Sequence, residues 1–309
     1  MKMMFLSKTK YFLILSGAII LLGLIVGIIN GGLNLGIDFT GGTILTIDLK
    51  TAFNDQDIAD ALKESGVDPA TAQIVHGGEK GNEAVIRLQL MPETTDMKAL
   101  RGSIVNSLEA KYPGAYAGEI ENVGGTTSGE IITNAFLSVV IAAALMLVYI
   151  WIRFALYSGI AGVIALIHDV LIMTAFVSIT QMQINSSYIA ACLTIVGYSI
   201  NDTIVVFDRI RENNRRYGAK EMPRMQVADL SIKETLPRTI NTSLTTLITI
   251  TAVYVLGVQS IKEFALPIII GLISGTYSSV FIASPIWIWL EERKDKKLRY
   301  KASLQKSKA

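Results

Sequence analysis

Few ionisable side chains interrupt the long apolar runs of this chain, and these few are of the types that proton chemistry requires. His168 and Asp169 are adjacent in one apolar run, Asp202 lies in the following run, and Arg238 opens the run after that. An ionisable residue inside a membrane span is costly and usually faces the interior of a helix bundle, where it serves function. A carboxylate opposite an arginine in such an interior suits proton relay. We therefore expect Asp202 and Arg238 to form a proton pathway.

The spacing around these two residues places further polar side chains on the same helix faces. Tyr198 and Ser199 stand four and three residues before Asp202, and residues at these spacings share one face of a helix. Hydroxyl-bearing residues likewise follow Arg238 along one face. We expect support for the pathway from Tyr198, Ser199, Asn201, Thr242, Thr245, Asp169 and His168.

Each of these assignments has a simpler structural alternative. Threonine hydroxyls in a span often bond only the preceding helical turn. An arginine near the membrane edge can extend its charge to the interface without any function, and Asp202 could make only a buried structural hydrogen bond. His168 and Asp169 are neighbours in sequence, so they point to different faces and need not act together.

Long apolar helices must position these residues. The chain has 309 residues, of which 51% are hydrophobic and 17% charged, and its mean hydropathy is +0.45. A soluble domain would carry about 25% charged residues, whereas the apolar runs here reach the roughly 20 residues that a spanning helix needs. The sequence predicts a polytopic α-helical membrane protein. Its six transmembrane helices are expected at about 11–29, 131–151, 154–178, 187–207, 239–258 and 264–290.

The basic residues set the expected orientation of these helices. Most of the 28 lysines and arginines fall in the N-terminal segment, in the loop 209–238 and in the tail 291–309. Segments rich in Lys and Arg stay on the cytoplasmic side, so we expect both termini there. The same placement argues against nucleic-acid binding, because these charges lie where they meet anionic lipid head groups.

The expected domains follow from this pattern. Residues 1–30 form an N-terminal transmembrane helix, which is retained because its apolar core is too long for a signal peptide and no small-residue cleavage site follows it. Residues 31–130 form an extracytoplasmic domain. Residues 131–290 form a five-helix transmembrane bundle with a cytoplasmic loop at 209–238, and residues 291–309 form a basic cytoplasmic tail.

The extracytoplasmic domain consists of two similar halves. Alternation of apolar and polar residues and helix-start signals predict strands at 43–49, 71–76, 84–90 and 116–123, and helices at 54–65 and 95–111. The order strand–helix–strand–strand–helix–strand is the split βαβ pattern of an α+β ferredoxin-like fold. The domain carries no catalytic constellation, so we expect binding or docking and no enzymatic activity.

A glycine-rich segment, GIDFTGGT at Gly36–Thr43, joins the first span to this domain. Paired glycines allow backbone bends that other residues avoid. We therefore expect Gly36, Asp38, Gly41 and Gly42 to form a structural coupling motif between the span and the domain. Asp38 is interpreted as a turn or capping residue at the membrane face.

The sequence predicts neither a metal site nor a bound cofactor. Cys192 is the only cysteine and lies in the fourth span, which excludes an intrachain disulfide and a Cys-based metal site. It is interpreted as a small apolar filler. A proton gradient is the expected energy source, and sodium is the alternative coupling ion, because sites lined by hydroxyls and carboxylates suit either.

Three segments carry a family signature: GIDFTGG at Gly36–Gly42, GYSINDTIVVFDRIREN at Gly197–Asn213, and PRTINTS at Pro237–Ser243. Together they resemble the SecF family of the bacterial Sec protein-export machinery. The resemblance covers essentially the whole chain. The second segment is highly specific, whereas the first is shared with the sister subunit SecD. The resemblance implies one half of an assembly of the resistance-nodulation-division (RND) type in the bacterial cell membrane, with Asp202 and Arg238 in the proton path.

The resemblance also implies partners. SecF pairs with SecD, and the pair associates with the SecYEG channel. The assembly uses the proton-motive force to complete export of the preprotein after the SecA ATPase has acted. This chain would need a SecD-like subunit in trans, and the second acidic group of the pathway would lie on that subunit.

Two other functions are compatible with these residues. The first is an RND-type proton-coupled small-molecule exporter, although such exporters usually carry two large outer loops in one chain. The second is an intramembrane aspartyl protease using Asp169 and Asp202. An arginine opposite Asp202 suits ion pairing better than the shared-proton pair of such enzymes. Drug-efflux assays and cleavage of a model helix would distinguish these functions.

Overall fold

The computed structural model of the chain describes residues 5–78, 81–88, 91, 95–153, 156–257 and 259–306. It separates into two compact units. The helical unit comprises Met1–Asn34, Leu137–Gln183 and Ser187–Ala309, and the α+β unit comprises Leu35–Phe136 and Ile184–Ser186. Parts of the predicted elements lie outside the described residues, namely Gln89 and Leu90 of a strand, Phe154 and Val258 at span ends, and 307–309 of the tail.

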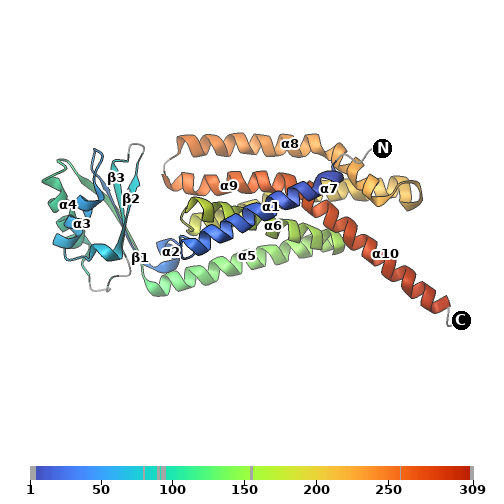
Figure 1. The fold of residues 1–309 in the computed structure, drawn as a ribbon, viewed down its shortest axis with the longest axis horizontal. Coiled ribbons are helices and arrows are strands. Elements are labelled where there is room, and N and C mark those ends of the chain that lie inside the picture. The colour runs from blue at the N-terminus through green and yellow to red at the C-terminus, as the bar shows by residue number, and fades with distance from the viewer. Residues whose placement is uncertain are drawn as a thin grey trace. The chain divides into compact units, whose positions relative to one another are not determined.

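The elements of the α+β unit follow the order predicted from the sequence. They are β1 (Gly42–Asp48), α3 (Asp55–Glu64), the 3₁₀ turn η2 (Pro69–Thr71), β2 (Ala72–Gly77), β3 (Glu83–Leu88), α4 (Met97–Glu109) and β4 (Tyr116–Val123). These strands pair antiparallel in the order β2-β3-β1-β4. Helices α3 and α4 contact each other and cover one face of the sheet (Figure 1).

Alternate side chains of the strands form the core of this unit. Leu45 and Ile47 of β1 and Ile86 of β3 are at most 2% exposed, as the two-residue period of a strand with one buried face requires. They pack against apolar residues of both helices, among them Ile58, Leu62, Ile104 and Leu108. Burial of one such aliphatic side chain contributes about 1.5–3 kcal/mol, so the sheet and the helices stabilise each other.

Short polar side chains define the starts of both helices. The Asn54 side chain accepts from the backbone N–H of Gln56, and the Asp96 carboxylate accepts from those of Lys98 and Ala99. Caps of this kind satisfy backbone donors that the helix itself leaves free. The starts predicted from the sequence therefore lie within two residues of those in the structure.

A short helix, α2 (Ile37–Thr40), precedes β1 and contains part of the coupling motif. Gly41 (φ 68°) and Gly42 (φ 137°) follow it with backbone angles that favour glycine. A Cβ on Gly42 would lie 2.5 Å from the carbonyl oxygen of Leu88, at the end of β3. The two glycines thus bend the chain sharply from α2 into the sheet.

Most of the long helices of the helical unit lie alongside one another (Figure 1). The helices of this unit are η1 (Leu6–Lys8), α1 (Thr9–Ile29), α5 (Gly125–Arg153), α6 (Leu156–Thr180), α7 (Ser186–Glu221), α8 (Arg224–Leu256), α9 (Gln259–Ser278) and α10 (Ser284–Lys306). Helix α10 runs away from the other helices toward the C-terminus (Figure 1). In the part of the chain that the structure describes, six helical segments are long and apolar enough to cross a membrane. Helix α6 contacts α1 and α9, and α9 also contacts α8.

Several helices extend beyond the predicted spans. Helix α7 continues to Glu221 and α8 begins at Arg224, so the segment 209–238, predicted as a loop, is helical except at its turn. The segment was predicted as a loop because it is rich in charged residues. It also contains apolar residues at helical spacing, of which Ile210 and Ile232 are buried. The predicted tail likewise continues as α10 to Lys306. The helical unit therefore extends well past its apolar core.

One wider turn connects α9 with α10. Residues Ser279–Ala283 form a π-helix, in which backbone hydrogen bonds join residues five apart. The Ser284 hydroxyl follows the same spacing and donates to the carbonyl oxygen of Ser279 at 3.0 Å. The chain therefore passes from α9 to α10 without leaving helical conformation.

Candidate functional site

Within the spans predicted from the sequence, two aspartates are buried and one histidine is largely buried. Asp169 on α6 is 0% exposed, Asp202 on α7 is 6% exposed, and the side chain of His168 is 11% exposed. A buried ionisable group is costly unless hydrogen bonds or charges compensate it. The partners of each group therefore indicate what it can do.

Asp169 is the centre of a cluster of hydroxyl groups. One of its carboxylate oxygens accepts from Ser199 on α7 at 2.5 Å and from Ser278 on α9 at 2.8 Å. The other accepts from Ser274 on α9 at 2.7 Å and lies 3.0 Å from Nδ1 of His168. Residues from α6, α7 and α9 thus converge on one carboxylate and satisfy both of its oxygens.

His168 extends this cluster to α1. Its Nε2 atom lies 2.8 Å from the hydroxyl oxygen of Ser16, which in turn lies 3.0 Å from the hydroxyl oxygen of Tyr277. Although two adjacent residues of a helix need not act together, the imidazole ring of His168 reaches the carboxylate of its neighbour Asp169. We call Asp169, His168, Ser16, Tyr277, Ser199, Ser274 and Ser278 the Asp169 cluster.

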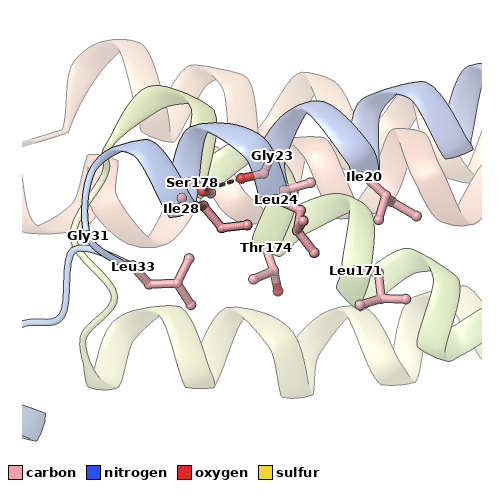
Figure 2. A pocket seen from close by; sticks show the side chains of 12 residues that line it. Ile20, Gly23, Leu24, Ile28, Gly31, Leu33, Leu171, Thr174 and Ser178 are labelled. Atoms are coloured by element: carbon pink, nitrogen blue, oxygen red, sulfur yellow. Dashed lines mark hydrogen bonds between the residues drawn. The ribbon is translucent and has the colours of Figure 1, made fainter.

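Glycines bring the helices of this cluster close together. A Cβ on Gly271 would lie 2.5 Å from the side chain of Ile195, and one on Gly23 would lie 2.5 Å from the Cα of Ala175. Helix α9 can therefore approach α7, and α1 can approach α6. In Figure 2 the Ser178 hydroxyl donates to the carbonyl oxygen of Gly23, at 2.7 Å. Close approach is what lets short serine side chains reach across the helix interfaces.

An apolar cavity of about 600 Å³ lies beside the contact of α1 with α6. Figure 2 shows Ile20, Leu24 and Ile28 of α1 facing Leu171 and Thr174 of α6 around it. None of the twelve described residues that line the cavity is ionisable. It therefore provides no group for proton transfer.

Asp202 has a much poorer set of partners than Asp169. Ser243 on α8 donates to its carboxylate at 3.3 Å, and within the described residues this is its one side-chain hydrogen bond. That distance exceeds the usual range for hydroxyl donors. Ser243 itself lies 2.8 Å from the hydroxyl oxygen of Thr276 on α9. Asp202 is thus buried with most of its acceptor capacity unused.

Arg238 was expected opposite Asp202, with hydroxyl groups between the two side chains. Among the described residues no ion pair joins the two, although the guanidinium attracts the carboxylate at longer range. Arg238 is exposed on α8, and Tyr198 and Asn201 are exposed on α7. The chain therefore presents these three polar residues at its surface and not around Asp202.

The predicted hydroxyl partners of Asp202 also differ from the observed one. The Thr245 hydroxyl donates to the carbonyl oxygen of Thr242, as the simpler alternative for threonines in a span anticipates. Ser199 shares a helix face with Asp202 but donates to Asp169 on α6. Ser243 faces Asp202, since one residue of offset rotates a side chain by about 100° around a helix.

Sequence reasoning missed five residues of the site: Ser16, Ser243, Ser274, Tyr277 and Ser278. One signal could have found two of them, because Ser274 and Ser278 are spaced by four residues in an otherwise apolar helix and therefore share a face. The others are single polar residues whose neighbours only the packing of α1, α8 and α9 reveals.

The arrangement does not resemble a proteolytic or metal centre. The shared-proton pair of an aspartyl protease needs two carboxyl groups in contact, but no hydrogen bond joins Asp169 to Asp202 among the described residues. In the same part of the chain, no group of three or more His, Cys, Asp or Glu side chains could hold a metal ion. Cys192 is buried, in keeping with a small apolar filler.

The fold and the site define a multi-pass helical membrane protein with buried carboxylates and one α+β unit. The family model described as protein export membrane protein SecD/SecF, C-terminal, matches residues 104–293, and that of the SecD/SecF GG motif matches residues 26–52. The protein translocase subunit SecF of Petrotoga mobilis is 35% identical, with coverage of 94% of this chain and 97% of the relative. The chain belongs to the SecF family of protein translocase subunits.

Longer relatives contain this chain as one part. It is 35% identical to the protein translocase subunit SecDF of Bacillus subtilis, covering 95% of this chain and 39% of the relative. The crystal structure of SecDF from Thermus thermophilus, described as a translocon-associated membrane protein, has a TM-score of 0.82 and 33% identity, covering 93% of this chain and 38% of that one. The chain thus spans about two fifths of the length of these SecDF proteins.

Proposed function

We propose that the chain is an accessory subunit of the bacterial preprotein translocase that couples proton movement to protein export. It acts with a SecD-like subunit, the SecYEG channel and SecA, and its substrate is the exported preprotein. It is neither an enzyme nor a nucleic-acid-binding protein, and it uses no cofactor besides the ion gradient. It lies in the bacterial cell membrane with both termini in the cytoplasm, in agreement with its distribution of Lys and Arg.

The environment of Asp202 carries this proposal. A carboxylate that is 6% exposed and has a single long hydrogen bond, from Ser243, gains little from remaining ionised in a span. It is therefore free to take up a proton when access opens. The Asp169 cluster lies next to Asp202, because Ser199 of the cluster and Asp202 are three residues apart on α7 and share a helix face. We propose that the cluster holds this part of α7 in place.

The exposed polar residues of the spans support a SecD-like partner. Arg238, Tyr198 and Asn201 are exposed on helices that are proposed to cross the membrane, and polar groups that face hydrocarbon are expensive. A second membrane subunit that covers them, and offers a carboxylate to Arg238, removes this cost. The second acidic group of the pathway then belongs to the partner.

The energy available matches a modest conformational change. A proton crossing 100 mV releases about 2.3 kcal/mol, and a two-state equilibrium responds strongly to a bias of a few kcal/mol. Protonation of Asp202 removes its attraction to Arg238, so that α7 and α8 can shift relative to each other. The coupling motif, Gly36, Asp38, Gly41 and Gly42, connects this change to the domain that begins at β1.

The α+β unit is the proposed docking element for the emerging preprotein, on the outer side of the membrane. The strand order β2-β3-β1-β4, with its two helices on one face, supports a ferredoxin-like fold. The described part of this unit carries no buried pair of ionisable side chains, which favours docking over catalysis.

Replacing Asp202 by Asn tests the proposal in cells whose export depends on this chain. We expect export to lose its response to the proton-motive force, because Asn cannot exchange a proton. The control is Asp208→Asn on the same helix, since Asp208 pairs with Arg211 in an exposed position. Export that is proton-dependent at the wild-type level in Asp202→Asn would overturn the proposal. Replacing sodium by potassium in the medium tests the alternative coupling ion.

A further inference from the structure

Two loops of the α+β unit are fastened to each other by backbone and side-chain hydrogen bonds. Leu35 and Ile184 form a parallel β-bridge, and the backbone N–H of Gly36 donates to the carbonyl oxygen of Ile184 at 2.7 Å. Two residues further along both segments, the backbone N–H of Ser186 donates to the Asp38 carboxylate at 2.7 Å. The segment that leads into β1 thus lies against the segment that leads into α7.

Asp38 acts on the first residue of a long helix. Ser186 begins α7, and the first N–H groups of a helix have no acceptor within it. A carboxylate at this end also interacts favourably with the positive end of the helix dipole. Asp38 therefore caps α7 from another part of the chain, while its own backbone lies in the first turn of α2.

The segment that carries Asp38 has little freedom to move independently of β1. The N–H groups of Phe39 and Thr40 donate to the carbonyl oxygen of Gly36, and that of Gly41 donates to Ile37, so α2 is a closed turn. Gly42 follows it directly and lies so close to Leu88 that a Cβ there would meet its carbonyl oxygen. A displacement at the start of β1 is therefore transmitted to Asp38.

We infer that Asp38 is a positioning residue that ties the glycine-containing entry to β1 to the start of α7. Helix α7 continues from Ser186 to Asp202, so the contact links the α+β unit to the helix that carries the proposed proton-binding carboxylate. This inference rests on the proposed function for its physiological meaning. The contact itself can be tested without any assay of export.

Hydrogen exchange of the full chain in lipid nanodiscs tests the contact. Asp38→Ala removes the acceptor, and we expect amides of the first turn of α7 to exchange about fivefold faster, as for loss of a typical cap. Asp96→Ala is the matched control, because Asp96 caps α4 with the same chemistry and should accelerate exchange in α4 alone. Unchanged exchange at the start of α7 in Asp38→Ala would overturn the inference.

A second variant removes the donor instead of the acceptor. Proline is tolerated at the first position of a helix and lacks the N–H, so Ser186→Pro breaks the same hydrogen bond even if Asp38→Ala fails to accumulate. We expect faster exchange at residues 187–190 in Ser186→Pro. In the double variant, Asp38→Ala should add nothing further, and additive effects would show that Asp38 acts elsewhere.

Export assays then test the coupling role. We expect Asp38→Ala to reduce export several-fold and Asp38→Asn to retain most of it, because the Asn oxygen still accepts from Ser186. Faster exchange in Asp38→Ala with wild-type export would overturn the coupling role. The Asp202→Asn variant separates the two proposals. If its export stays proton-dependent, the proposed function fails. The hydrogen-exchange data on Asp38→Ala still decide whether Asp38 holds the start of α7.

Discussion

Asp169 and Asp202 lie on neighbouring helices of the same unit, yet their surroundings are opposite. Asp169 accepts hydrogen bonds from Ser199, Ser274 and Ser278 and contacts His168, whereas Asp202 accepts one long bond from Ser243. A fully satisfied carboxylate holds helices together, since every donor around it would lose its partner if it were removed. A poorly satisfied one contributes little to packing and is available for exchange. Burial alone therefore does not identify the functional group.

The largest expected effect on stability comes from the satisfied carboxylate. Asp169→Asn places an amide donor among the hydroxyl donors of the cluster, and disrupting such a buried charged network costs roughly 3–5 kcal/mol. Denaturant titration in detergent micelles measures this loss, with Asp208→Asn as the exposed control. Equal losses in Asp169→Asn and Asp202→Asn would remove the distinction between the two sites.

An intermediate effect is expected from the glycine that lets α9 approach α7. In Gly271→Ala the new methyl group meets Ile195 and Met173 at 2.5 and 2.6 Å, and over-packing of this kind costs typically 1–3 kcal/mol. The same titration should show no destabilisation for Gly197→Ala, whose Cβ would have nothing within 4 Å, since alanine favours a helix over glycine by about 1 kcal/mol. If both alanines were equally tolerated, close approach would not be what sustains the Asp169 cluster.

A smaller effect on stability is expected from the poorly satisfied carboxylate. Asp202→Asn keeps the shape of the side chain and weakens one long hydrogen bond, so the free energy of unfolding should change by less than about 1 kcal/mol. Proton-dependent export should nevertheless be lost in the same variant. A loss of stability as large as that of Asp169→Asn would instead make Asp202 a structural residue.

The smallest effect is expected at a partly exposed carboxylate of the α+β unit, that of Asp57. Hydrogen bonds from Lys111 and Tyr112 lower the pKa of Asp57 below its usual 3.8. Because the folded-state pKa is the lower one, the stabilisation is fully present above about pH 4 and is lost as the pH falls through the lowered value. Hydrogen exchange in α3 should therefore differ between wild type and Asp57→Asn at pH 6, and this difference should shrink near pH 2.5.

The matched control for that measurement is Asp60→Asn, because Asp60 accepts from the neighbouring Gln56 side chain on the same helix. The difference from wild type at α3 should be smaller for this variant. A pH-independent difference in Asp57→Asn would show that Lys111 and Tyr112 do not act through the charge of Asp57.

Local patterns were sufficient to predict the α+β unit. Alternation along β1 and β3 and the caps at Asn54 and Asp96 depend on residues close in sequence, so the order of elements could be derived without a structure. The helical segment 209–238 was missed because its many charges resemble a loop, although buried residues such as Ile210, Val227 and Ile232 recur within it. The apolar runs, in contrast, marked all six spans, although α8 begins at Arg224, well before the predicted start at 239, because charged residues precede its apolar part.

The site was only partly predictable. The rule that ionisable residues inside spans face the bundle interior identified Asp202 and Asp169 as buried, and spacing along one helix establishes which residues share a face. It does not establish how a second helix is rotated about its own axis, so Ser243 was missed and Thr242 and Thr245 were chosen instead. Contacts between sequence-distant residues, such as Ser16 with His168, depend on glycine-mediated packing that no single segment encodes.

The π-helical turn at Ser279–Ala283 makes the length of this region as important as its composition. One residue corresponds to a rotation of about 100° in an α-helix, and a π turn accommodates one residue more than an α turn. Deleting a single residue there would keep Ser274 and Ser278 directed at Asp169 but would turn the buried faces of Trp287 and Ile288 away from their neighbours. Substitutions in this turn should thus be far better tolerated than single-residue deletions, a pattern that a deletion scan of residues 279–283 would reveal.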